Sequence, residues 1–356
     1  MLRGCDARLL TQNGRYYLHA PDKNHEQVED ALKHLIGISG WARTLAYPKT
    51  LEAITAACIS EGKNLASNGV NTFKIEARRT DKSFPHDSYK LRCICGQAVK
   101  DAIPGLKVDV NHPAAIVNVE IREQAYIYSD SRKGLGGLPI GTAGRGLLLL
   151  SGGIDSPVAG FMMASRGMGI DAIHFHAYPY TSDEARQKTI DLAEILGRYC
   201  MGIRLYIVGF TRVQLRIKER APVEWATVLL RMAMMDCASQ IAEKIKAKCL
   251  ITGESLSQVA SQTIENISCT QSGITLPILR PLIGMDKDSI IRKAEQIGSY
   301  RTSIKPFQDC CVLFSPPHPI LRGKPIEAAE LYKALELEPL IKEAIKECEI
   351  VKIMRS

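Results

Sequence analysis

The chain has 356 residues, more than a usual single domain, which predicts two or three domains. Hydrophobic residues make up 46%, which excludes a wholly disordered protein, and 46 Lys and Arg against 38 Asp and Glu give a net charge of +8, compatible with a polyanionic partner. No apolar run reaches the length of a membrane span, and the N-terminal MLRGCDARLL is too charged for a signal peptide. The 11 cysteines form no pair of CxxC motifs, so we expect reduced thiols in a soluble, cytoplasmic protein with no membrane partner.

The first 130 residues predict two modules. Residues 1–47 hold one predicted strand, GRYYLHA, and one predicted helix, HEQVEDALKHLIG, which together make an incomplete domain. Residues 48–130 predict a fuller α/β unit, with a helix at 51–63 and a strand, TFKIEARR, in which apolar and charged residues alternate. A further helix is expected over 88–103, and strands over 107–110, 115–122 and 124–128.

A basic stretch in this second module is a candidate RNA contact. Its cations are Lys74, Arg78, Arg79 and Lys82. Phe73 and Phe84 are interleaved with them, and the stretch could contact a nucleic-acid backbone. The alternative is an ordinary solvated charged face.

Residues 131–146 belong to a glycine- and serine-rich segment and predict a linker. In the remainder, 147–356, predicted strands alternate with amphipathic helices, which indicates a doubly wound parallel sheet. The strands are expected over 147–150, 171–176, 204–208 and 250–252.

The stretch LLLLSGGIDSPVAG at 147–160 is typical of a buried strand, a glycine-rich turn and a helix. Ser151, Gly152 and Gly153 would present backbone N–H groups to an anion, while Ser156 is expected to cap the helix. The sequence departs from the P-loop and from GxGxxG, and it matches the pyrophosphate loop of enzymes that split ATP into AMP and pyrophosphate. Asp155 would help to hold Mg²⁺ on the phosphates. The alternative is a tight turn without a ligand.

Other candidate residues follow the later strands, because ligands of such sheets bind at the carboxyl ends of the strands. His174 and Phe175 could contact an adenine, or His174 could be a satisfied core histidine. Gly253 lacks a side chain and would admit a ligand. Gln258 and Gln262 are predicted to lie one turn apart on a helix, where they alone would be a solvated face.

Two cations and a cysteine pair complete the candidates. Arg231 lies in a predicted buried helix and needs an anionic partner, either a ligand or an acidic side chain. Lys287 starts a helix that Asp286 or Asp288 could cap, which hints at a phosphate contact. Adjacent Cys310 and Cys311 suggest a thiol that carries a persulfide, whereas inert packing is expected of the other cysteines such as Cys58, Cys237 and Cys249.

Several stretches together resemble the tRNA 4-thiouridine synthetases, or tRNA sulfurtransferases. They are FKIEARRTDKSFPHDS, GLGGLPIGTAGRGLLLLSGGIDSPVAG, HFHAYPYTSDEARQK, TGESLSQVASQT, LRPLIGMDK and DCC, so the resemblance covers about residues 48–320. It implies a truncated ferredoxin-like domain at 1–47, a THUMP RNA-binding domain at 48–130 and a pyrophosphate-loop (adenine nucleotide alpha hydrolase-like) catalytic domain at 147–356.

The resemblance implies ATP-dependent adenylation of uridine 8 in tRNA, then replacement of the activated oxygen by sulfur with release of AMP. Asp155 and Lys287 would serve activation, Cys310 would carry the sulfur, and Cys311 would resolve the persulfide or pack. The implied cofactors are ATP and Mg²⁺, and the partners are tRNA and a cysteine desulfurase or other persulfide donor. ATP contacts are expected from Leu149, Leu150, Ser151, Gly152, Gly153, Asp155, Ser156, His174, Phe175, Arg231, Gly253 and Gln262.

Compared with the family pattern, we expect a first domain that lacks the usual N-terminal strand region before MLRGCDAR and an enzyme that works without a C-terminal rhodanese domain. A shortened first domain puts tRNA affinity in question, and a role in thiazole synthesis for thiamine is less secure. Whether the chain forms a homodimer stays open. Two alternatives remain, namely another pyrophosphate-loop ligase and a tRNA-binding protein that has lost activity. Neither needs the whole combination of basic module, Asp155 and Cys310.

Overall fold

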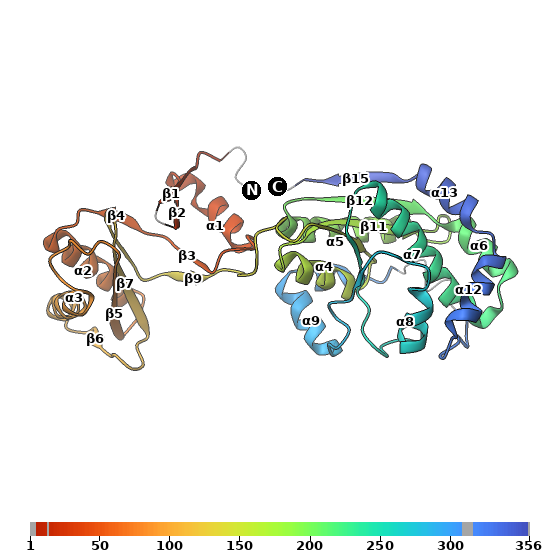
Figure 1. Ribbon diagram of the computed structural model, residues 1–356. Helices are drawn as coiled ribbons and strands as arrows, with labels where there is room; N and C mark the ends of the chain where they lie inside the picture. Colours follow the sequence, from red (N-terminus) through yellow and green to blue (C-terminus); the bar gives the residue numbers. More distant parts are fainter. Residues whose placement is uncertain (1–4, 13, 308–315, 355–356) are drawn as a thin grey trace. The chain divides into compact units, whose positions relative to one another are not determined.

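The computed structural model describes residues 5–12, 14–307 and 316–354. It divides into two compact units (Figure 1): one comprises Ser39–Gly134, and the other comprises Met1–Ile38 with Leu135–Ser356. We call them the inserted unit and the main unit. Among the described residues, none of the helices has the length and apolar character needed to span a bilayer.

The inserted unit is a five-stranded sheet with two helices on one face (Figure 1). Caps define its helices, because Thr50 accepts a hydrogen bond from the Ala53 N–H and Asp87 accepts one from the Lys90 N–H. The apolar side chains of the longest strand, including the fully buried Phe73, pack against these helices. In sheet order the strands are β4 (Leu45–Tyr47), β8 (Ala125–Tyr128), β7 (Ala115–Ile121), β5 (Thr72–Arg79) and β6 (Lys107–Val108), and the helices are α2 (Leu51–Ser67) and α3 (Ser88–Ala102).

A separate two-stranded ribbon lies at the two ends of the inserted unit. Strand β3 (Gly40–Ala42) pairs antiparallel with β9 (Ser131–Lys133). The guanidinium of Arg132 lies over the Trp41 ring, 4.9 Å from its centroid. Part of the predicted linker 131–146 is therefore a strand, and Leu138 farther along donates to the Ser165 carbonyl at 3.1 Å.

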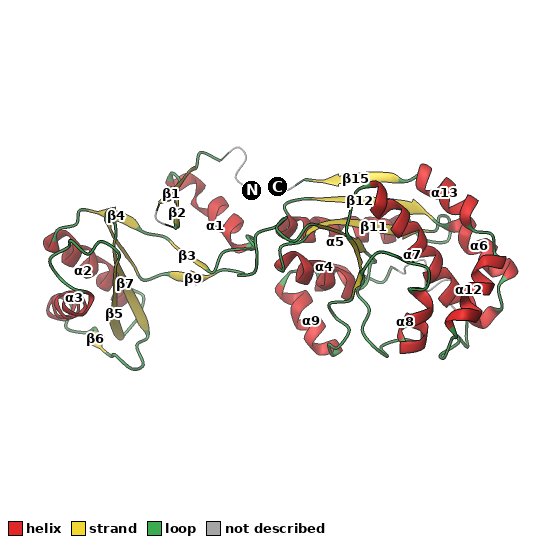
Figure 2. Ribbon diagram, viewed as in Figure 1, coloured by secondary structure: helices red, strands yellow, loops and turns green. Residues whose placement is uncertain are grey.

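The main unit is built on a six-stranded sheet with helices on both faces (Figure 2). Neighbouring strands are parallel except at one edge, where β15 runs antiparallel to β12. This confirms the predicted doubly wound architecture. In sheet order the strands are β14 (Ile278–Leu279), β13 (Cys249–Ile251), β10 (Arg145–Leu149), β11 (Gly169–His176), β12 (Ile203–Gly209) and β15 (Glu349–Ile353).

Each face of this sheet has its own apolar core. Leu148 and Leu150 pack on the face covered by α4 (Asp155–Ser165), α5 (Asp183–Cys200), α9 (Lys287–Gln296) and α10 (Tyr300–Ser303). Leu147 and Ile173 point to the opposite face. That face carries α6 (Thr211–Arg220), α7 (Ala226–Lys244), α8 (Ile264–Thr270), α12 (Pro325–Ala334) and α13 (Glu338–Lys346). Burial on both sides explains why the central strands are mostly apolar.

The N-terminal segment adds a hairpin and a helix to the main unit. The hairpin comprises β1 (Arg8–Gln12) and β2 (Arg15–His19), and it is followed by a short 3-10 turn, η1 (Asp22–Asn24), and α1 (His25–Lys33). The prediction had a single strand here, so β1 is a correction; its side chains are all exposed and give no apolar pattern. Asp30 pairs with Arg198 of α5 at 2.9 Å, and Ile36 joins the core beneath α4.

Candidate nucleotide-binding site

The glycine-rich loop between β10 and α4 is held in a compact turn by its own serines. Leu150 extends the pairing of β10 by donating to the Ile173 carbonyl at 2.8 Å. The Ser156 hydroxyl accepts from the Ser151 N–H at 3.0 Å, and the Ser151 hydroxyl accepts from the Gly153 N–H at 3.3 Å. The loop therefore folds back over the first turn of α4, with the Ser151 and Gly153 N–H groups bonded to serine hydroxyls that a phosphate oxygen would have to replace.

Ser156 differs from its predicted role. It was expected to cap α4, but α4 begins at Asp155, its N-cap is Ile154, and no side chain caps it. Ser156 lies inside the first turn, 4% exposed, with its hydroxyl turned back to the loop. The hydroxyl thus stabilises the start of the loop. The N-terminus of α4, which carries a partial positive charge, has no side-chain cap.

Gly253 is required for a different reason from the one predicted. A Cβ atom at this position would lie 2.8 Å from the Ser156 nitrogen and 2.9 Å from the carbonyl carbon of Asp155. The space that a side chain would fill is occupied by the first turn of α4 and not held open for a ligand. The missing side chain lets the segment after β13 pack directly against the loop.

Asp155 and Lys287, which the sequence singled out, form an ion pair. The Lys287 ammonium nitrogen lies 2.6 Å from Asp155 Oδ1, and Gln258 donates to Oδ2 at 2.9 Å. Asp286 caps α9 by accepting from the Ser289 N–H at 2.7 Å, as predicted, which fixes Lys287 at the first position of that helix. Three segments far apart in the sequence therefore meet at the start of α4.

The donor set at Asp155 suits Mg²⁺. The Asp155 side chain is 21% exposed, and each carboxylate oxygen can accept more than one contact. Within the described residues there is no group of three or more His, Cys, Asp or Glu side chains that could form a closed metal cage. Mg²⁺ ordinarily binds through one or two carboxylates, with water and substrate phosphate as its other ligands. Asp155 fits such an open site.

Gln258 and Gln262 occupy turns and not the predicted helix. Gln262 ends a 3-10 turn, η3 (Ala260–Gln262), and its Oε1 accepts from the Ser255 N–H at 3.3 Å. Leu256 and Val259, which would pack on one face of such a helix, are instead 46% and 52% exposed. The segment follows the carboxyl end of β13 as a loop, in which Gln262 is buried, whereas Gln258 is exposed and contacts the site only through its bond to Asp155.

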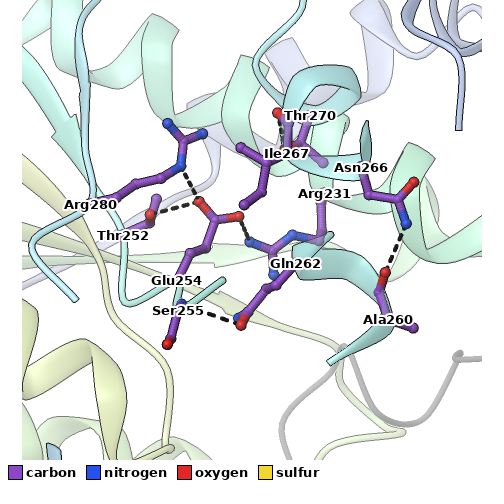
Figure 3. A network of polar contacts seen from close by, with 10 residues as sticks. All are labelled: Arg231, Thr252, Glu254, Ser255, Ala260, Gln262, Asn266, Ile267, Thr270 and Arg280. Carbon is purple, nitrogen blue, oxygen red and sulfur yellow. Dashed lines mark hydrogen bonds and ion pairs between the residues drawn. The ribbon is translucent and has the colours of Figure 1, made fainter. Parts of the chain in front are cut away.

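Arg231 takes part in a buried ionic cluster (Figure 3). Glu254 is 2% exposed and pairs with Arg231 through one oxygen, while its other oxygen accepts from Arg280 Nε at 2.7 Å and from the Thr252 hydroxyl at 2.8 Å. Burial opposes ionisation of Glu254, but the two guanidinium groups outweigh it and hold the pKa of the carboxyl below its ordinary value. The acidic partner that the sequence left open for Arg231 is thus present.

His174 and Phe175 are mostly buried at the end of β11. His174 Nδ1 donates to the Leu150 carbonyl at 3.1 Å, so its ring braces the entry to the glycine-rich loop. The Phe175 ring packs on Phe210 with centroids 4.7 Å apart and is 6% exposed. The Phe175 ring therefore presents no free face on which an adenine could stack.

Cys310 and Cys311 lie outside the described residues. The chain that leads toward them is tied to the site, because Ser303 donates to the Gly153 carbonyl at 3.3 Å. Lys188, 5% exposed, donates to the carbonyls of Lys305 at 2.8 Å and Phe307 at 3.3 Å. Lys188 was missed because its spacing within α5 gives no sign of a partner more than 100 residues away.

The other cysteines named from the sequence behave as packing residues. Cys58, Cys237 and Cys249 are buried, and burial raises the pKa of Cys249 to about 11 and that of Cys237 still further above its ordinary value. A thiol with a raised pKa carries little thiolate at neutral pH and is a poor nucleophile. The inert role predicted for these cysteines fits the structure.

The predicted RNA-binding cations differ in accessibility. Arg78 and Lys82 are exposed, but Lys74 pairs with Glu76 at 3.0 Å, and Arg79 donates to the carbonyls of Phe84 and His86 at 2.7 and 3.2 Å. The two phenylalanines interleaved with these cations in the sequence are buried and do not lie with them on the surface. Phe84 is 7% exposed, and both it and the phenylalanine at 73 lie in the core of the inserted unit.

Known proteins share this architecture. A family model described as thiamine biosynthesis protein (ThiI) matches residues 141–337, and a THUMP domain model matches residues 48–130. A 4-thiouridine synthetase, whose crystal structure is an RNA complex with bound ATP, superposes with a TM-score of 0.91 at 35% identity, covering 99% of this chain and 92% of that chain. The crystal structure of PH1313 from Pyrococcus horikoshii Ot3 has a TM-score of 0.65 at 22% identity over 83% of this chain and 88% of that one, which supports the fold alone.

Sequence relatives agree with this structural likeness. The "Probable tRNA sulfurtransferase" of Treponema pallidum (strain Nichols) is 48% identical over 349 residues, which cover 97% of this chain and 87% of the relative. A protein of the same name from Caldanaerobacter subterraneus subsp. tengcongensis is 45% identical over 92% of this chain and 83% of its own length. The resemblance drawn from the motifs is confirmed, and the chain belongs to the tRNA sulfurtransferase (ThiI) family.

Proposed function

We propose that this enzyme adenylates uridine 8 of tRNA with ATP and then replaces the activated oxygen by sulfur, giving 4-thiouridine, AMP and pyrophosphate. The observation that carries the proposal is the meeting of Asp155, Lys287 and Gln258 at the N-terminus of α4, beside a loop of backbone N–H groups. A carboxylate and an ammonium there suit a reaction in which a pyrophosphate group leaves. Similarity to a 4-thiouridine synthetase with bound ATP supports the same substrate.

We place the ATP site at the carboxyl ends of β10, β11 and β13. The glycine-rich loop would bind the phosphates through its N–H groups, and Asp155 would hold Mg²⁺, which when bound neutralises phosphate charge. Lys287 would exchange part of its contact with Asp155 for the pyrophosphate. The remaining proposed contacts, backbone or side chain, come from Leu149, Leu150, Ser151, Gly152, Gly153, Ser156, His174, Phe175, Arg231, Gly253 and Gln262.

Sulfur transfer is assigned to Cys310. Its persulfide, loaded by a cysteine desulfurase or another donor, would attack C4 of the adenylated uridine through the terminal sulfur, and AMP would leave with the former C4 oxygen. This attack leaves a disulfide between Cys310 Sγ and the sulfur on C4. Cys311 would attack Cys310 Sγ, which releases 4-thiouridine and forms a Cys310–Cys311 disulfide that a thiol reductant must then reduce, or Cys311 would only pack. The family model's description also supports a proposed second use of this sulfur, in making the thiamine thiazole.

RNA binding is assigned to the THUMP segment at 48–130, preceded by a ferredoxin-like segment at 1–47 and followed by the catalytic segment at 147–356. The exposed Arg78 and Lys82 are the cations of the predicted set most open to a tRNA phosphate, and Lys74 would have to leave Glu76 to join them. Arg79 would act indirectly, because its two bonds to the 84–86 backbone shape the loop that carries Lys82.

The proposal is tested with purified protein, unmodified tRNA, ATP, Mg²⁺, cysteine and a cysteine desulfurase, with AMP and 4-thiouridine read together. Asp155→Ala should lose both products, whereas Cys310→Ser should still form AMP but no 4-thiouridine. Asp101→Ala and Cys93→Ser, which change exposed residues of α3, serve as matched controls. Thiolation that survives in Cys310→Ser and is lost in Cys311→Ser would transfer the sulfur-carrying role to Cys311. No AMP from the unaltered chain would contradict the adenylation step.

A further inference from the structure

The buried cluster in Figure 3 carries one more positive charge than negative. Arg231 comes from α7, Glu254 follows β13, and Arg280 follows β14, so all three meet at the carboxyl edge of the sheet. Their side chains are 22%, 2% and 12% exposed. A pair of Arg231 with Glu254 alone would be neutral, and Arg280 is what leaves the cluster with a net charge of +1.

The carboxylate is divided between the two arginines. One Glu254 oxygen contacts Arg231 Nη2, and the other accepts from Arg280 Nε at 2.7 Å and the Thr252 hydroxyl at 2.8 Å. Neither guanidinium therefore has the carboxylate to itself. Since charge in a poorly solvated site acts over several ångströms, this division keeps part of the field of Arg231 unneutralised.

The cluster is not arranged for stability alone. Arg231 Nε and Arg280 Nη2 are buried, and neither has a hydrogen-bond partner among the described residues. Buried donors without partners cost free energy, and a buried ion pair is often no more stabilising than apolar side chains of the same volume. A second buried arginine with an unpaired nitrogen is better explained by the charge that it brings to the site.

We propose that Arg280 is a positioning residue for nucleotide binding: it shares Glu254 with Arg231, so that Arg231 stays both fixed in place and effectively cationic toward the anionic nucleotide. The inference rests on the proposed function, in which Arg231 faces ATP. It assigns Arg280 no contact with ATP. Its effect passes through Glu254.

Charge arithmetic supplies the test. Arg280→Met makes the cluster neutral, whereas the double variant Glu254→Gln/Arg280→Met restores a net charge of +1 without the Glu254 carboxylate or the Arg280 guanidinium. We expect the dissociation constant for ATP to rise on the order of tenfold in Arg280→Met and to recover to within about threefold of the unaltered chain in the double variant. Arg280→Lys, which keeps the charge, should bind nearly as well as the unaltered chain.

The measurement is titration calorimetry with ATP and Mg²⁺ on the whole chain, with far-ultraviolet circular dichroism to confirm folding of each variant. Arg198→Met is the matched control, because it removes an arginine from the exposed pair with Asp30. An unchanged dissociation constant in Arg280→Met, or a double variant that binds no better than Arg280→Met, would overturn the role of Arg280. If Arg280→Met does not fold, the double variant is compared with Arg280→Lys, and a difference of tenfold or more between them overturns it equally. Failure of the unaltered chain to bind ATP would instead overturn the proposed function, and this inference with it.

Discussion

Among single residues, Gly253 shows how a missing side chain brings two segments of the site together. Gly253→Ala should lower the free energy of unfolding of the main unit by about 1–3 kcal/mol, because its Cβ would meet the Ser156 backbone, which cannot rotate away as a side chain can. AMP formation should fall with it, since the displaced turn carries Asp155. Urea unfolding and the AMP assay check both. Gly209→Ala is the control, because a Cβ there meets nothing within 4 Å, and equal losses in the two variants would contradict the steric explanation.

His176 gives the main unit a predictable response to acid. Burial, and then the nearby charge of Arg186, lowers the pKa of this histidine from its ordinary value of about 6.5. The folded state therefore favours the neutral ring, and the contribution to stability is present above about pH 6.5 and is lost as the pH falls through the lower pKa of the folded state. Thermal unfolding midpoints between pH 8 and pH 5 should decrease less in His176→Gln than in the unaltered chain. A variant with the same pH slope would contradict this assignment.

At the scale of elements, the close approach of α4 to the sheet depends on Gly160. A Cβ there would lie 2.7 Å from methyl groups of Leu148 in β10 and Leu196 in α5. We expect Gly160→Ala to destabilise the main unit by about 1–3 kcal/mol, because these core leucines must shift. Gly96→Ala in α3, where the nearest atom is 3.8 Å away, should instead stabilise the inserted unit by up to about 1 kcal/mol through helix propensity. Urea unfolding of each unit measures the two changes in the free energy of unfolding. Two changes of the same sign would contradict the packing argument.

How well an element was predicted from the sequence depends on its place in the sheet. The central strands β10 to β13 match their predicted ranges to within one or two residues, because burial on both faces favours a mostly apolar stretch that stands out in the sequence. Edge strands escaped prediction: β14 has only two residues, and β15 is mostly exposed and lacks such a run. The helix expected around Gln258 is a loop, because tertiary contacts at the carboxyl end of β13, such as those of Gln258 with Asp155 and of Gln262 with Ser255, prevail over the local helix propensity.

The same limit applies to the site. Asp155 and Lys287 could be found because a glycine-rich turn and a helix start announce them locally. Glu254, Arg280 and Lys188 could not, since their significance lies in partners between 23 and 119 residues away. Ion pairs between distant segments leave no periodic signal in the sequence, and only the folded arrangement assigns them.

At the scale of the whole molecule, the core of the inserted unit is separate from the cores of the main unit, which predicts two separable folding units. The inserted unit has its own core, between the helices α2 and α3 and the one sheet face that they cover. A chain of residues 39–134 alone should fold, with a cooperative thermal transition followed by circular dichroism and dispersed amide signals in nuclear magnetic resonance. An unfolded fragment would show that this core depends on the rest of the chain.

The antiparallel ribbon of β3 and β9 has a consequence for proteolysis. The inserted unit interrupts the main unit between Ile38 and Leu135, so the backbone crosses from one unit to the other twice, and the two crossings begin and end in paired strands. A protease that nicks one crossing leaves the other covalent link whole, and the ribbon's hydrogen bonds still hold the cut end. Release of the inserted unit therefore requires two cuts, whereas a single cut separates two domains that are joined in tandem by one linker.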